Sequence, residues 1–121
     1  MLSLDEFVVL CKQYCPEWKD YVDWDDGEYR VSYNNLSDYV LCMYQYKENK
    51  IYIPQKLIYK SGNFDAATDD GVQPTTWEEY IIINVEDPDA KDRLIKSLIK
   101  LHQDYKQIQQ DLKLTKIKED F

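Results

Sequence analysis

The stretch that decides the fold is LIKSLIKLHQDYKQIQQDL, residues 94–112. Its large apolar side chains are separated alternately by four and three residues, at Leu94, Leu98, Leu101, Tyr105, Ile108 and Leu112. This spacing is typical of an α-helix with one apolar seam, as in a coiled coil. Asp87 and Pro88 supply an N-cap and a first-turn proline, so we predict a helix from Pro88 to Lys116. A helix of about 28 residues is roughly 42 Å long, which is more than a domain of this size needs.

The apolar stripe of this helix is widest in its first half, where Ile95 and Ile99 flank the seam. We expect that half to dock on a sheet, and the stripe narrows beyond Leu101. Residues 102–121 are therefore expected to project as a helical tail, to pair with a second copy or to lie along a partner. The residues predicted to form such an interface are Leu98, Leu101, Tyr105, Ile108 and Leu112.

Residues 3–15 predict a second helix, at the N-terminal side. Ser3 and Glu6 match a capping box, in which the serine hydroxyl accepts from the Glu6 amide and the Glu6 carboxylate binds the Ser3 amide. Leu2 and Phe7 occupy the two positions of a hydrophobic staple. Pro16 ends this helix and is expected to begin a short second turn that reaches about Val22.

Further along the chain, apolar residues that alternate with polar ones predict strands. Tyr29, Val31 and Tyr33 share one face of a short strand, and 38–46 and 51–59 read as a hairpin joined by the polar residues 47–50. Pro54 lacks a backbone donor, so we expect the second strand of this hairpin to be an edge strand or to be bulged there.

The remaining segments complete the predicted fold. Residues 61–76 have no periodicity and are expected to form an exposed loop. Residues 77–85 predict a buried strand, although Thr76 and Glu79 fit a capping box and a short helix stays open. The order of elements predicts a single α+β domain over 1–121, with an antiparallel sheet of three to four strands around a central hairpin and a helix at each end.

The charge of the chain restricts the classes of partner. The 121 residues have a formal net charge of −8 and a sequence pI near 4.6. Residues 1–90 carry a net charge of −11 and residues 91–121 a net charge of +3. We therefore expect a protein partner with a basic surface, and neither direct nucleic acid binding nor a membrane partner.

The N-terminus and the cysteines indicate a reduced, cytoplasmic setting, or the host cytoplasm for a viral protein. Asp5 and Glu6 lie where a secretory signal would carry basic residues. Cys11, Cys15 and Cys42 cannot all pair within one chain and lack metal-knuckle spacing, so we expect reduced, buried thiols and no metal site.

The segment 17–29 has the most unusual composition, because carboxylates alternate in it with large aromatic rings. Carboxylates attract Lys and Arg, and the rings add contact area and cation–π contacts. The alternative is an ordinary connection in which Trp18 and Tyr21 belong to the core, and a further acidic group follows in the long loop. The predicted partner-binding residues are Trp18, Asp20, Asp23, Trp24, Asp25, Asp26, Glu28, Asp69 and Asp70.

Catalysis has little support in the sequence. His102 is the natural acid–base candidate, but it falls beside the helix seam, and we find neither a nucleophile motif nor a glycine-rich phosphate loop. A calcium loop at Asp23–Asn34 fails because its glycine is one place early and its twelfth residue is Asn34. We therefore expect a non-catalytic protein without cofactors.

Two functions fit these observations. The first is a small acidic inhibitor or adaptor that masks a basic surface, a profile shared by immunity proteins and by phage proteins that block nucleic-acid-binding enzymes. The second is a structural or assembly protein, such as a virion component, that forms an oligomer through its C-terminal helix.

Overall fold

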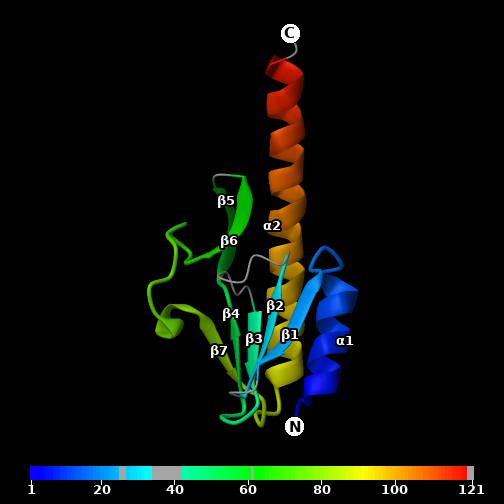
Figure 1. Cartoon of the computed structure of the whole chain (residues 1–121), viewed down its shortest axis with the longest axis vertical. Coiled ribbons are helices and arrows are strands. Elements are labelled where there is room, and N and C mark those ends of the chain that lie inside the picture. Colours follow the sequence, from blue (N-terminus) through cyan, green and yellow to red (C-terminus); the bar gives the residue numbers. More distant parts are fainter. Residues whose placement is uncertain (25–26, 34–41, 61, 120–121) are drawn as a thin grey trace.

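The computed structural model describes residues 1–24, 27–33, 42–60 and 62–119. A helix lies at each end of this chain, with the strands between them (Figure 1). The elements in chain order are α1 (Leu4–Tyr14), β1 (Asp20–Trp24), β2 (Glu28–Ser32), β3 (Cys42–Gln45), β4 (Lys50–Ile53), β5 (Lys56–Lys60), β6 (Asn63–Ala67), the 3-10 helix η1 (Trp77–Glu79), β7 (Ile81–Asn84) and α2 (Ala90–Glu119).

The described strands form two antiparallel sheets. Five strands pair in the order β1-β2-β3-β4-β7, and β5 pairs only with β6 in a separate hairpin. The α+β class and the two terminal helices are confirmed, but the predicted strand number of three to four is too low. The expected strand 51–59 is in fact two strands in different sheets, because the chain leaves the first sheet at the buried Pro54.

One face of the five-stranded sheet carries the core, and both helices pack against it. Phe7 of α1 lies 5.4 Å from the ring of Tyr44 on β3, and Leu94 and Leu98 of α2 are fully buried. The opposite face carries a row of directly paired residues from all five strands. This row contains Val22, Arg30, Met43, Tyr52 and Ile82.

The observed starts of the two helices agree only in part with those predicted from the sequence. The Glu6 backbone N–H donates to the Ser3 hydroxyl over 3.1 Å, and the Glu6 carboxylate lies 3.5 Å from the same hydroxyl. The second helix begins at Ala90, two residues later than predicted, because the Asp87 carbonyl first closes a turn with the Ala90 N–H. It ends at Glu119.

Two expectations about irregular segments are wrong. Residues 20–24 form β1 instead of continuing a helical turn from Pro16, because each of them pairs with β2. Residues 63–67 form β6 instead of a loop, where Gly62 has a φ of +84° just before the strand. For the segment 77–85 the sequence left a strand and a short helix open, and the structure contains both. The short helix η1 comes first and the strand β7 follows.

Candidate protein-binding site

One end of the molecule gathers the end of β1, the start of β2, the β3–β4 and β7–α2 connections and the starts of both helices (Figure 1, bottom). Backbone hydrogen bonds tie these segments together, from Leu2 N–H to the Val85 carbonyl, from Val85 N–H to Asn49, and from Tyr46 N–H to Gly27. The carboxylates among the described residues here are Asp5, Glu6, Asp23, Glu28, Glu48, Glu86, Asp87, Asp89 and Asp92. We call this set the acidic end.

Part of this acidity has a structural reason. Asp5, Glu6 and Asp92 lie in the first turns of α1 and α2, where a helix dipole favours negative charge. Glu48 and Glu86 lie instead on exposed connections between elements, where the dipoles give no such reason. Glu86 accepts a hydrogen bond from the Asn49 side chain over 3.4 Å, and neither carboxylate is in an ion pair within the described part of the chain.

Basic residues at the same end are fewer, and two of them are engaged within the chain. Arg93 donates to the Ile82 carbonyl over 3.3 Å. The methylene stem of Lys47 lies across Gly27, where an added Cβ would come within 2.6 Å of it. Gly27 also has a φ of +98°, a backbone conformation that favours glycine. The other two basic residues at this end are Lys50 and Lys91.

The structure separates the residues that the sequence grouped in segment 17–29. Asp23 and Glu28 are at the acidic end, where Asp23 accepts from the Tyr46 hydroxyl over 3.0 Å and Glu28 binds Arg30. Asp20 lies at the other end of β1 and accepts from the Ser32 hydroxyl. Trp18 is 2% exposed in the core, so its ring is covered by the chain itself. The side chain of Trp24 and residues Asp25 and Asp26 lie outside the described part.

The second acidic group lies far from the first. Asp69 and Asp70 precede β7, at the opposite edge of the sheet from β1. They line a hollow of about 540 Å³, and the Asp69 N–H donates to the Gln55 side chain over 2.8 Å. These two residues therefore do not extend the surface formed by Asp23 and Glu28.

The seam of the C-terminal helix is largely filled within the chain. Leu98 and Leu101 are buried, and Tyr105 and Ile108 pack against the core as partly buried side chains. Leu112 is 42% exposed. The β5–β6 hairpin, which the sequence did not predict, provides this cover, because the Phe64 ring of β6 lies 5.2 Å from the Tyr105 ring. The turn-forming pair Ser61–Gly62 was the sequence signal that could have revealed it.

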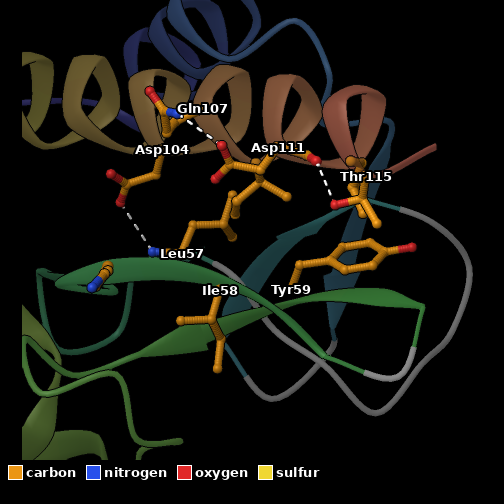
Figure 2. A pocket seen from close by; sticks show the side chains of 10 residues that line it. Leu57, Ile58, Tyr59, Asp104, Gln107, Asp111 and Thr115 are labelled. Atoms are coloured by element: carbon orange, nitrogen blue, oxygen red, sulfur yellow. Dashed lines mark hydrogen bonds between the residues drawn. The ribbon is translucent and has the colours of Figure 1, made fainter. Parts of the chain in front are cut away.

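A groove of about 520 Å³ remains between α2 and β5 (Figure 2). Leu57 and Tyr59 of β5 line one side, and Asp104, Asp111 and other residues of α2 line the opposite side. The groove combines apolar and acidic groups but also contains Lys56, so its charge does not select one kind of ligand.

His102 has a partner that the sequence did not reveal. Its Nδ1 lies 3.0 Å from both carboxylate oxygens of Glu17, which follows α1. The Glu17 side chain is 5% exposed and that of His102 is 26% exposed. This contact joins the end of α1 to the middle of α2, which is a structural use of the histidine.

The cysteines are free and buried, as the sequence suggested. The Cys15 thiol donates to the Leu98 carbonyl over 3.3 Å, and burial raises its pKa. Burial also raises the pKa of Cys42. The described residues contain no cluster of three or more potential metal ligands. In the same part of the chain, no helix is both long enough and apolar enough to cross a bilayer.

Comparisons of the chain with protein-family models, with curated protein sequences and with solved structures found no match.

Proposed function

We propose that this chain is a non-catalytic protein-binding module that covers a basic surface of a partner protein, as a small inhibitor or adaptor does. The acidic end carries the proposal. Carboxylates from four separate segments meet there, and several of them lie on exposed connections without an ion pair to any described residue.

The surroundings of the acidic end suit a protein partner. Tyr46, which directly follows β3, is 36% exposed, and Val22, on β1, is 39% exposed. Exposed apolar area beside a ring of charge is what a protein interface needs, because the apolar part excludes water and the charges select the partner. A phosphate backbone would be repelled by the same carboxylates.

Affinity capture with matched variants tests this function. The immobilised chain is compared with a variant carrying Asp23→Asn, Glu48→Gln and Glu86→Gln, which removes three exposed charges from the acidic end. The control carries Asp69→Asn, Asp70→Asn and Glu78→Gln, which removes three exposed charges elsewhere.

We expect a basic protein to be retained by the original chain and by the control, and to bind the first variant about tenfold more weakly at low salt. Binding should weaken as the salt concentration rises. Equal losses in both variants, or retention that is insensitive to salt, would contradict the proposal.

A second function, assembly through the C-terminal helix, is favoured by one observation. Figure 1 shows α2 extending past the sheet and past the β5–β6 hairpin. Leu112 and Leu114, in the C-terminal part of this helix, are 42% and 56% exposed. Light scattering across a salt series tests it. An oligomer that persists at high salt and dissociates with Leu112→Glu supports assembly, whereas a monomer at high concentration rules it out.

A further inference from the structure

The outer edge of β1 is open in the described part of the chain. β1 is the first strand of the order β1-β2-β3-β4-β7, so only one of its edges is paired within the sheet. No backbone hydrogen bond joins it to a described segment outside the β2 strand. An edge strand carries alternate N–H and C=O groups that point away from its neighbour, and these groups can pair with another strand.

Proline, lysine and a β-bulge, three common means of protecting such an edge, are absent from β1. Its sequence, DYVDW, contains neither proline nor lysine. Its register with β2 runs without a skipped residue from Asp20 opposite Ser32 to Trp24 opposite Glu28, so no bulge turns the edge away. What this edge carries instead is negative charge, at Asp20 and Asp23.

We propose that an extended basic segment of the partner docks on this edge as a sixth strand of the sheet. This inference rests on the proposed function and specifies how the partner binds. Asp20 and Val22 lie on the face of the sheet opposite the helices, and Asp23 lies on the other face. A Lys or Arg side chain opposite Asp23 on one face, with an apolar residue opposite Val22 on the other, forms favourable cross-strand pairs. Because β1 runs into the acidic end, further basic residues of the segment meet Glu48 and its neighbours.

Charge argues against a second copy of this chain as the occupant. Two β1 strands paired antiparallel around Val22 place Asp23 opposite Tyr21 of the second copy, so the two Asp23 carboxylates become diagonal neighbours on one face without a base between them. Two negative charges at this separation repel each other. The same charges favour a basic strand.

Synthetic peptides test the docking mode. The probe is a peptide of alternating lysine and valine, compared with the same peptide N-methylated at its valines, the peptide N-methylated at its lysines, and an alternating glutamate–valine peptide. N-methylation removes the backbone donors of one edge but keeps the charge, so it separates strand pairing from simple attraction. Titration calorimetry gives the affinities, and amide hydrogen exchange reports on residues 20–24.

We expect the lysine–valine peptide to bind and to protect amides of β1, the glutamate–valine peptide not to bind, and one of the two N-methylated peptides to bind at least about tenfold more weakly. Equal binding by both N-methylated peptides would overturn strand addition but leave the proposed function standing. The same holds if no peptide binds while the immobilised chain still retains a basic protein. If neither the peptides nor a basic protein bind, the proposed function itself fails.

A pair of single variants adds an independent test. Val22 on β1 and Ile82 on β7 lie on the same face at opposite edges of the sheet, with exposures of 39% and 36%. Val22→Lys introduces repulsion and the usual edge protection at β1, so we expect it to weaken peptide binding about fivefold. Ile82→Lys is the matched control and should leave binding unchanged.

Equal affinities of the two variants would overturn the inference. A dimer of the original chain that Val22→Lys dissociates would show that a second copy occupies the edge, and this would also overturn it. Circular dichroism confirms that both variants are folded before binding is measured.

Discussion

Asp104, in the middle of α2, accepts a hydrogen bond from the backbone N–H of Leu57 on β5 over 3.1 Å (Figure 2). A neighbouring strand would take this N–H in a wider sheet, but here a helix side chain takes it. Leu57 itself is 3% exposed. The bond therefore fixes the two-stranded hairpin on the helix, and a hairpin of this size is not stable alone.

Asp104→Ala should lower the free energy of unfolding by about 1–2 kcal/mol, because it leaves the Leu57 N–H without an acceptor in a buried setting. Asp104→Asn keeps an acceptor oxygen and should cost less. Urea denaturation measures both, with Asp111→Ala as the control one heptad further along α2. If the loss in Asp104→Ala is no greater than in Asp111→Ala, the hairpin is not held by this bond.

The sequence predicted the elements whose own side chains carry a clear period. The long helix follows from its seam, and β2 follows from Tyr29, Val31 and Tyr33 alternating with polar residues. β1 and β6 were missed because each is short and contains acidic residues, such as Asp20 and Asp65, that are typical of loops. Their pairing partners decide their structure, and a local pattern does not contain that information.

The candidate site could be predicted only in part for a related reason. Asp23 and Glu28 were named from the local composition of one segment. Glu48 and Glu86 are separated from them in sequence and reach the same end only through the sheet turns, for example where the Asn49 side chain donates to Glu86 over 3.4 Å. Trp18 fits both surface and core by composition, and only the packing places it in the core.

Removing the side-chain hydroxyl should change the free energy of unfolding differently at Tyr44 and at Tyr21. The Tyr44 hydroxyl donates to the Leu2 carbonyl over 2.7 Å in the core, so Tyr44→Phe should lower the free energy of unfolding by about 1 kcal/mol. The Tyr21 hydroxyl is buried without a hydrogen-bond partner among the described residues. Tyr21→Phe should therefore leave stability unchanged or raise it. Urea denaturation of both variants checks the order, and a larger loss for Tyr21→Phe would show that its hydroxyl is paired in solution.

The buried carboxyl group of Asp65 should make the free energy of unfolding fall as the pH rises. It is 6% exposed, its Oδ1 has no partner among the described residues, and burial raises its pKa although nearby Lys60 opposes the shift. The folded state thus holds the proton more tightly than the unfolded state. The contribution of Asp65 to the free energy of unfolding is fully present below its pKa in the unfolded state, about 3.9. It is lost as the pH rises through the pKa of Asp65 in the folded state.

Asp65→Asn removes the buried charge, so it should raise the free energy of unfolding at pH 7 by about 1 kcal/mol, and the gain should vanish toward pH 3. Thermal unfolding across this pH range measures the effect. Asp69→Asn is the control, because that side chain is exposed and should show no such trend. A gain that is independent of pH would mean that Asp65 does not titrate as its burial implies.

The contact between Glu17 and His102 should be strongly coupled, because the Glu17 side chain is only 5% exposed. Removing His102 leaves a covered carboxylate without a donor, so a double-mutant cycle of Glu17→Ala and His102→Ala should give a coupling free energy of about 1–2 kcal/mol. The exposed pair Lys100 and Asp104, with a distance of 3.1 Å, is the comparison and should couple by about 0.5 kcal/mol or less. Chemical denaturation of the two sets of variants gives both values. Equal coupling in the two pairs would mean that burial adds nothing to the Glu17–His102 contact, and the junction of α1 with α2 would then depend on its apolar side chains alone.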